Sequence, residues 1–308
     1  MSKLVVAKDK TGDFNTIQAA IDKIPENNIY PIEIFIKQGI YREVINIPAE
    51  KQFIKLIGED KFKTVISYDN FNGKLKEDGT KYGTTGSSTA FLYADNFQAE
   101  NLTFANTHLR DQYQDDGSQA VAVKSQGDKM VFKNVRFLGH QDTLYANQGR
   151  QYFSDCYIEG DVDFIFGAAQ AVFENCQIHS LDRNKDINGY ITAASTSIND
   201  AYGFLFIDCE FTADTAADTV YLGRPWHPGG DPDAIAAVVI RDSQLGKHIK
   251  KTGWTQMSGF SPAEARLFEY NNYGPGAVTN SSRRTLTEKQ AQEFTIKDVL
   301  KDWKPQIK

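Results

Sequence analysis

Short apolar stretches interrupted by a single Asn or Asp recur along the chain. Within them Val, Ile and Phe alternate with polar residues, and Asn, Asp and Gly mark the turns, a pattern typical of β-strands. Six segments share it: Phe97–Phe104, Met130–Phe137, Gln151–Ile158, Ala171–Ile178, Phe204–Phe211 and Val238–Leu245.

The polar position of this repeat recurs at two intervals. Its members are Asn101, Asn134, Asp155, Asn175, Asp208 and Asp242, separated by 33, 21, 20, 33 and 34 residues. We interpret the shorter interval as a bare repeat and the longer one as a repeat that carries an insertion. Strands that recur every ~20 residues without a helix between them favour an all-β solenoid, the parallel β-helix. A β-sandwich with similarly spaced short strands is the alternative.

Both ends of a solenoid expose core and need covering. Thr16–Ile24 places apolar residues at helical spacing before Pro25, so we expect a short capping helix there. Thr287–Gln290 has the sequence of a capping box and predicts a short helix at the other end. Because no Pro- or Gly-rich linker divides the chain, we expect residues 1–308 to form a single domain.

Composition and charge exclude several classes of protein. Of the 308 residues, 41% are hydrophobic and 12% are aromatic, enough for a substantial core. The net charge of −6 and the absence of Lys/Arg runs argue against a nucleic-acid partner. No apolar run approaches the ~18 residues that a membrane helix needs. The first residues, Met1–Val5, lack the apolar core of a signal peptide, so the protein is either cytoplasmic or has had a secretion signal removed.

The cysteines follow the phase of the repeat. Cys156 and Cys176 each come one residue after its polar position, and Cys209 has the same phase one coil further on. Because adjacent strands lie ~4.8 Å apart, a Cys156–Cys176 disulfide is sterically allowed in an oxidising compartment. A column of buried free thiols is the alternative.

Two carboxylates also share a phase. Asp142 and Asp163 each lie eight residues after a polar position of the repeat, which would place them at equivalent points of neighbouring coils. Carboxylates stacked ~5 Å apart repel each other, and one pKa should rise, as in a paired acid and nucleophile. Two solvent-facing turn residues are the alternative.

The residues around this pair favour catalysis. Gln119 and Gln141 are neutral donors that can hold an oxyanion. Arg224 can keep a carboxylate ionised and orient it, and Trp226 offers a face on which a sugar can stack. Each also has a structural explanation, as a turn, surface or core residue. We expect three segments to form walls on this face of the solenoid: 108–118, 181–189 and 227–233.

With these residues identified, the chain resembles the pectin methylesterases. Motifs of that family occur in order along nearly the whole chain: GIYRE (39–43), GTTGSST (83–89), QAVAV (119–123), GHQDTL (139–144), VDFIFG (162–167) and LGRPW (222–226). Val123 stands where many members have Leu, a small difference. The resemblance implies a right-handed, single-stranded parallel β-helix.

The resemblance also implies roles for individual residues. Asp163 would be the nucleophile, Asp142 the general acid and then base, and Arg224 the partner of Asp163. Gln119 and Gln141 would hold the oxyanion. The groove that binds the sugar would be lined by Tyr145, Val162, Phe166, Trp226 and, more loosely, Met257. Relatives also contain the Cys156–Cys176 bridge.

The reaction so implied is hydrolysis of methyl esters at galacturonate C6 in pectin, through an acyl-enzyme and without metal or cofactor. Three alternatives remain: a glycoside hydrolase, because ~5 Å is also the carboxylate spacing of retaining glycosidases; a calcium-dependent lyase; and a non-catalytic carbohydrate-binding solenoid. Because pectin lies outside cells or is imported into a periplasm, the resemblance implies a secreted or periplasmic protein with its signal peptide removed, and we expect a monomer. The acidic net charge would repel demethylated product and predicts dispersed action on highly esterified stretches.

Overall fold

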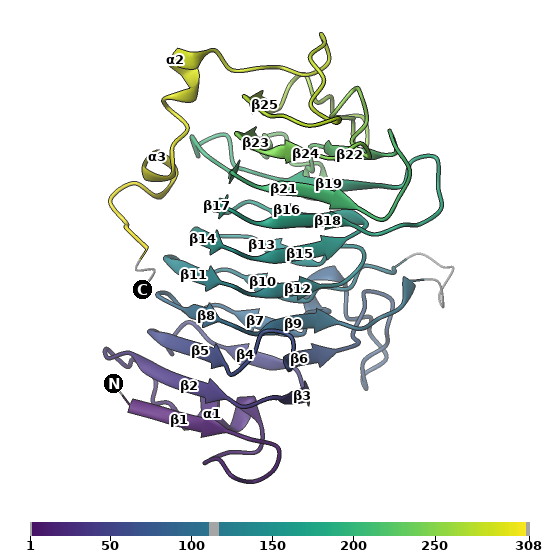
Figure 1. Ribbon diagram of the computed structural model, residues 1–308. Coiled ribbons are helices and arrows are strands. Elements are labelled where there is room, and N and C mark those ends of the chain that lie inside the picture. Colours follow the sequence, from purple (N-terminus) through teal and green to yellow (C-terminus); the bar gives the residue numbers. More distant parts are fainter. Residues whose placement is uncertain (1, 111–116, 306–308) are drawn as a thin grey trace.

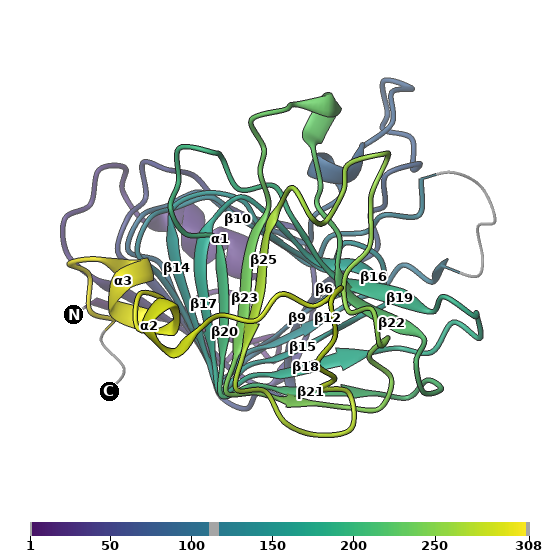
Figure 2. The same cartoon turned by 90° about the horizontal axis from the view of Figure 1, so that it is seen from above.

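The computed structural model describes residues 2–110 and 117–305, whose strands form three parallel sheets. Each turn of the chain adds one strand to sheet A, then one to sheet B and one to sheet C, and the next turn stacks on it (Figures 1 and 2). The protein is a right-handed parallel β-helix, as the repeat predicts, and the alternative of a β-sandwich is wrong.

Each sheet takes one strand from nearly every coil. Sheet A contains β1 (Ser2–Val6), β2 (Ile32–Ile36), β5 (Ile54–Gly58), β8 (Gln98–Glu100), β11 (Met130–Lys133), β14 (Arg150–Ser154), β17 (Gln170–Glu174), β20 (Phe204–Ile207), β23 (Ala237–Arg241) and β25 (Arg266–Tyr270). Sheet B contains β3 (Gly39–Arg42), β6 (Thr64–Tyr68), β9 (Thr103–Asn106), β12 (Arg136–Leu138), β15 (Tyr157–Gly160), β18 (Gln177–Ser180), β21 (Glu210–Ala213) and β24 (Gln244–Leu245). Sheet C contains β4 (Ile45–Ile47), β7 (Ala90–Leu92), β10 (Val123–Ser125), β13 (Leu144–Ala146), β16 (Val162–Gly167), β19 (Gly189–Ala194) and β22 (Val220–Gly223).

The polar position of the repeat is the turn between sheets A and B. All six of its Asn and Asp residues have a left-handed backbone, with φ between 51° and 62°. Asn and Asp adopt this conformation more readily than other non-glycine residues, which explains their recurrence. The side chains also bond between coils: Asn134 Nδ2 donates to Asn101 Oδ1 over 2.7 Å, and Asn175 Nδ2 donates to Asp155 Oδ1 over 2.6 Å.

A stack of aromatic rings fixes the register inside the coils. Phe132, Phe153, Phe173 and Phe206 are paired residues on successive strands of sheet A. Their ring centroids are 4.7, 4.6 and 4.5 Å apart, close to the ~4.8 Å between paired strands. A slip of one residue would turn these rings out of the core, so their burial holds every turn in phase.

The three cysteines are buried free thiols. The Cys156 thiol donates to the Phe132 carbonyl over 3.3 Å, Cys176 to Phe153 over 3.5 Å, and Cys209 to Phe173 over 3.3 Å. Each sulfur thus bonds the backbone of a preceding coil. The structure contains the column of thiols in place of the disulfide between Cys156 and Cys176.

The N-terminal cap agrees with the sequence. Helix α1 (Ile17–Lys23) begins after Thr16, whose hydroxyl accepts from the Ala19 amide over 3.3 Å. Its Ile17, Ala20 and Ile21 are buried against β1, β2 and β4. The helix therefore covers the open end of the first coil (Figure 1).

The predicted position of the C-terminal helix is wrong. The capping box at Thr287 does open α2 (Glu288–Ala291), followed by α3 (Ile296–Leu300), but these helices run along the outer face of sheet A (Figures 1 and 2). They cover apolar side chains that point outward from the sheet: Val131, Tyr152, Val172, Leu205 and Val239. Sheet A is consequently buried on both faces in this region, where its strands are almost wholly apolar.

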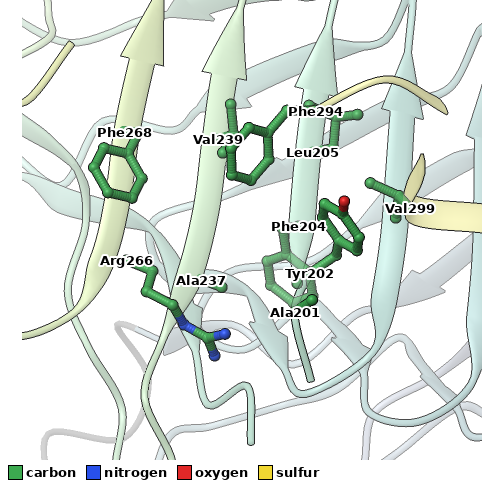
Figure 3. Close-up of a pocket in the computed structure, with 11 residues that line it drawn as sticks. Ala201, Tyr202, Phe204, Leu205, Ala237, Val239, Arg266, Phe268, Phe294 and Val299 are labelled. Atoms are coloured by element: carbon green, nitrogen blue, oxygen red, sulfur yellow. The ribbon is translucent and has the colours of Figure 1, made fainter. Parts of the chain in front are cut away.

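A small hollow of about 50 Å³ remains under this C-terminal segment (Figure 3). Phe294 and Val299 face it from the segment, Phe268 lines it from β25, and Arg266 lies at its edge. The Arg266 guanidinium is held by backbone carbonyls, including that of Ile235 at 2.7 Å. The hollow is part of the packing between the segment and the sheet.

An ion pair lies at the last rung of the stack. Glu269 on β25 accepts two hydrogen bonds from the Arg283 guanidinium, and Arg283 Nη1 donates to the Gly276 carbonyl over 2.6 Å. Both side chains are less than a tenth exposed. Loop residues after β25 thus close this end with a buried charge pair.

Among the described residues, no helix is long and apolar enough to cross a membrane.

Candidate active site

A pocket of about 320 Å³ opens beside sheet C and gathers most of the residues singled out in the sequence. Its lining residues are Thr84, Thr85, Gln119, Gln141, Asp142, Asp163, Phe166, Ala193, Arg224, Trp226 and Met257. They come from β16 and β19, from the segments that precede β7, β10 and β13, and from the segments that follow β22 and β24.

Asp142 and Asp163 occupy equivalent points of neighbouring coils, as their spacing predicts. Leu144 pairs with Ile165, which sets the two aspartates in the same register, and the Asp142 amide donates to the Val162 carbonyl over 3.0 Å. Both aspartates have a left-handed backbone, with φ of 66° and 51°. Asp163 also lies at a β-bulge, where the pairing of β16 with β19 shifts. A bulge redirects a side chain, and here it presents Asp163 to the pocket.

Arg224 binds one of these two carboxylates. Its Nε donates to Asp163 Oδ1 over 2.8 Å and its Nη2 donates to Asp163 Oδ2 over 2.6 Å, a bidentate pair. The guanidinium carbon lies 3.8 Å from the centroid of the Tyr190 ring, which supports it from the other side. By contrast, no described residue donates a hydrogen bond to the Asp142 carboxyl. This group lines the pocket and is available to a bound substrate.

The two carboxylates differ in their hold on a proton. Burial, followed by the charge of Asp163, raises the pKa of Asp142 well above its usual value. Burial also raises the pKa of Asp163, but the hydrogen bonds and charge of Arg224 oppose that rise. As the pH rises, Asp163 is therefore the carboxylate that ionises first, and Asp142 keeps its proton to higher pH.

Two amides are oriented by their neighbours. Asn72 Nδ2 donates to the Gln119 side-chain oxygen over 2.7 Å, and the Ser118 hydroxyl donates to the Gln141 side-chain oxygen over 3.2 Å. Because both oxygens act as acceptors, the Nε2 groups are left as donors on a pocket wall. Neither Nε2 donates to another described residue.

The expected sugar-binding residues divide into two groups. Phe166, Trp226 and Met257 line the pocket. Tyr145 stacks behind Phe166, with ring centroids 4.3 Å apart, and is 7% exposed; Val162 is 5% exposed. Neither Tyr145 nor Val162 lines the pocket: Tyr145 packs behind Phe166 and Trp226, and Val162 directly precedes Asp163 on β16.

The segments expected to form walls contribute less than predicted. No residue of 181–189 or 227–233 lines the pocket, and part of 108–118 lies outside the described residues. Thr84 and Thr85 line it instead; they belong to η1 (Thr84–Gly86), on the same side of the coils as η3 (Pro228–Gly230) (Figure 2). The GTTGSST motif was the signal that could have identified them.

Across the described chain, no cluster of three or more His, Cys, Asp or Glu side chains could hold a metal ion.

Unequal carboxylates side by side suit acyl transfer. An ionised one can attack a carbonyl while a protonated neighbour supplies the leaving group with a proton. Amide donors on the wall suit the oxyanion that such an attack creates. The fold and this chemistry together define a β-helix ester hydrolase.

Comparisons with known proteins identify the family. The family model described as Pectinesterase matches residues 3–302. Pectinesterase A of Dickeya chrysanthemi is 39% identical over 329 residues, which cover 96% of this chain and 88% of that protein. Pectinesterase 31 of Arabidopsis thaliana is 35% identical, over 94% of this chain and 89% of that protein. A crystal structure of a pectin methylesterase in complex with a hexasaccharide has a TM-score of 0.94 and 38% identity, covering 100% of this chain and 99% of that one.

The chain belongs to the pectinesterase family, and it is a carboxylic ester hydrolase. The same likenesses favour the esterase over the glycoside hydrolase, the lyase and the non-catalytic solenoid.

Proposed function

We propose that this protein hydrolyses the methyl esters at galacturonate C6 in pectin, releasing methanol and pectate, with Asp163 as the nucleophile. The observation that carries the assignment of roles is the bidentate pair between Arg224 and Asp163. It favours ionisation of Asp163 and leaves Asp142 as the proton donor. The hexasaccharide bound to a related pectin methylesterase supports a polymeric sugar substrate.

The first half of the reaction forms an acyl-enzyme. A carboxylate oxygen of Asp163 attacks the ester carbonyl carbon, and the oxyanion that develops accepts hydrogen bonds from Gln119 and Gln141. The bond to the methoxy oxygen then breaks, and Asp142 gives its proton to that oxygen, so methanol leaves. C6 is now joined to Asp163 as an anhydride.

The second half regenerates the enzyme. Asp142, now a carboxylate, takes a proton from water, and the resulting hydroxide attacks C6. The anhydride bond breaks, Asp163 returns as a carboxylate, and Asp142 keeps the proton. Trp226, Phe166 and Met257 would pack against the sugar beside the reacting ester, and Tyr145 would hold Phe166 and Trp226 in place. No step requires a metal or cofactor.

Methanol release from highly methyl-esterified pectin tests the assignment. We expect methanol from the parent and none from Asp163→Asn, whose asparagine tolerates the left-handed φ of this position. Asp155→Asn is the matched control, because Asp155 is an exposed left-handed residue of the same coil. Constant viscosity would exclude chain cleavage, and unchanged activity with a chelator would exclude the calcium-dependent lyase. Normal turnover by Asp163→Asn would refute the nucleophile.

We further propose that residues 1–308 act as one monomeric catalytic domain, secreted or periplasmic after removal of a signal peptide. With a net charge of −6, the protein should favour highly esterified stretches and leave dispersed free acids. Product mapping that finds long demethylated blocks would contradict this action pattern, and a dimer in sedimentation experiments would contradict the monomer.

A further inference from the structure

A third buried carboxylate lies beside the catalytic pair and has no part in the proposed mechanism. Asp161 is two residues before Asp163, and its side chain is 1% exposed. Arg110 Nη1 donates to Asp161 Oδ1 over 2.5 Å, and His140 Nδ1 lies 3.5 Å from Asp161 Oδ2. The three side chains come from three segments: after β9, before β13 and between β15 and β16.

Backbone hydrogen bonds also fix the position of Asp161. Its amide donates to the His140 carbonyl over 3.0 Å, and its own carbonyl accepts from the Tyr190 amide over 3.1 Å. Gly189 packs so closely that a Cβ there would lie 1.9 Å from the Asp161 carbonyl oxygen. Asp161 is therefore held between the coil before it and the coil after it. Because Asp163 is only two residues further along the chain, the position of Asp161 also constrains that of Asp163.

An anion that is so deeply buried requires a fixed cation, since an unpaired buried charge is strongly destabilising. Arg110 meets that requirement, but a neutral residue at position 161 would have needed no partner. The pair is thus a costly arrangement next to the two carboxylates whose charge decides turnover, which suggests a role beyond folding.

We propose that the Arg110–Asp161 ion pair is a positioning element of the esterase site, which ties the chain after β9 to the catalytic coil and sets the charge balance around Asp142 and Asp163. The inference rests on the proposed esterase function and assigns it two further residues.

The two members of the pair act on the catalytic carboxylates in opposite directions. Arg110 lowers the pKa of both Asp142 and Asp163, and Asp161 raises both. Arg224 also lowers the pKa of both carboxylates. His140 faces Asp161 from the preceding coil, and His108 interacts with His140 in turn. With the pair intact the two effects oppose each other; with one member removed, the other acts alone.

The test is the pH profile of kcat/KM for methanol release. This profile should be bell-shaped, with an acidic limb set by Asp163 and an alkaline limb set by Asp142. Arg110→Gln leaves the Asp161 charge uncompensated, so both limbs should move to higher pH. Asp161→Asn leaves the Arg110 charge uncompensated, so both limbs of the profile should move to lower pH. Each shift should be about one pH unit, the order expected when a nearby unit charge is removed at an effective dielectric constant of about 20. The double variant should return close to the parent profile.

Several variants separate this role from a structural one. Arg110→Lys keeps the charge and should restore the parent profile even if the fold is weakened. Arg150→Gln removes the ion pairs of a different arginine, with Asp128 and Asp302, at β14 of sheet A, and should lower the melting temperature without moving the profile. Repeating the series in a His140→Gln background removes any charge that a protonated imidazole supplies.

The outcomes are distinct. Opposite shifts of the two single variants support the inference. Shifts in the same direction, or lowered activity with an unmoved profile in both, would overturn it and leave a structural ion pair. Absence of methanol from the parent protein would instead refute the proposed function itself.

Discussion

Replacing Asp142 with asparagine should abolish turnover and at the same time stabilise the fold. Asp142 is 8% exposed, lacks a hydrogen bond from any described residue, and stands next to a second carboxylate, so its ionised form is disfavoured in the native state. Asparagine has nearly the same shape, carries no charge and tolerates a φ of 66°. Alanine would be a poorer probe, because it would add about 1–2 kcal/mol of left-handed backbone strain.

The gain in stability should depend on pH in a defined direction. The native pKa of Asp142 is raised, so the stability that its protonated form contributes is complete below the unfolded pKa of ~3.9 and is lost as the pH rises through the native pKa. Within that window the parent should lose about 1.4 kcal/mol per pH unit relative to Asp142→Asn. For a chain of this length the difference corresponds to about 2 °C in melting temperature per pH unit.

Calorimetric melting of parent and variant from pH 4 to pH 8 measures this difference. Asp208→Asn is the control, because Asp208 is exposed and also left-handed, with φ 54°. We expect its melting temperature to follow the parent at every pH. A difference between Asp142→Asn and the parent that stays constant with pH, or that favours the parent increasingly as the pH rises, would refute the assignment of Asp142 as the proton-holding carboxylate.

Four further predictions address the oxyanion donors, the guanidinium, the thiols and the core. Gln119→Ala should lower kcat roughly 100–1,000-fold with little change in KM, and a pure KM effect in methanol-release kinetics would contradict its role. Arg224→Lys keeps the charge but loses the bidentate geometry, so kcat should fall at least about tenfold; parent-like kinetics would show that charge alone suffices. Thiol titration should find no reactive cysteine in the native protein and three after unfolding without reductant, including Cys176; fewer would indicate a disulfide. Phe153→Leu should cost about 1–3 kcal/mol in chemical unfolding, whereas the exposed Phe62→Leu should stay within about 0.5 kcal/mol, and equal effects would argue against the ring stack as the source of register.

Repetition explains what the sequence made predictable. A residue such as Asn134 is selected by the local backbone, since few other residues accept its left-handed turn. Once the phase of these turns is known, any two residues at the same offset must stack, and this alone pairs Asp142 with Asp163. The helix at Thr16 was equally predictable, because capping and amphipathic spacing are local signals.

Contacts between unrelated segments were beyond the same reasoning. The partner of Gln119 is Asn72, and that of Asp161 is Arg110; neither pair shares a phase of the repeat. The C-terminal helices were assigned to the wrong place because Tyr152 and Val172, which point away from the core, are as apolar as the residues that point into it. Likewise the spacing of the cysteines showed that their sulfurs could meet, but not that each thiol would donate to a backbone carbonyl.

The ion pair at the last rung bears on how the molecule behaves at high concentration. A stack of parallel strands ends in a row of backbone groups that could template a strand of another molecule. Here that strand, β25, is already occupied at Glu269, whose amide donates to the Arg284 carbonyl and whose carbonyl accepts from the Leu286 amide. The buried ion pair between Glu269 and Arg283 holds this covering segment against the strand. At the opposite end, α1 blocks the first coil. End-to-end growth into fibres is thus disfavoured at both ends, by a segment bonded to the last strand at one and by a helix at the other, and a fold built by adding similar rungs keeps a finite length.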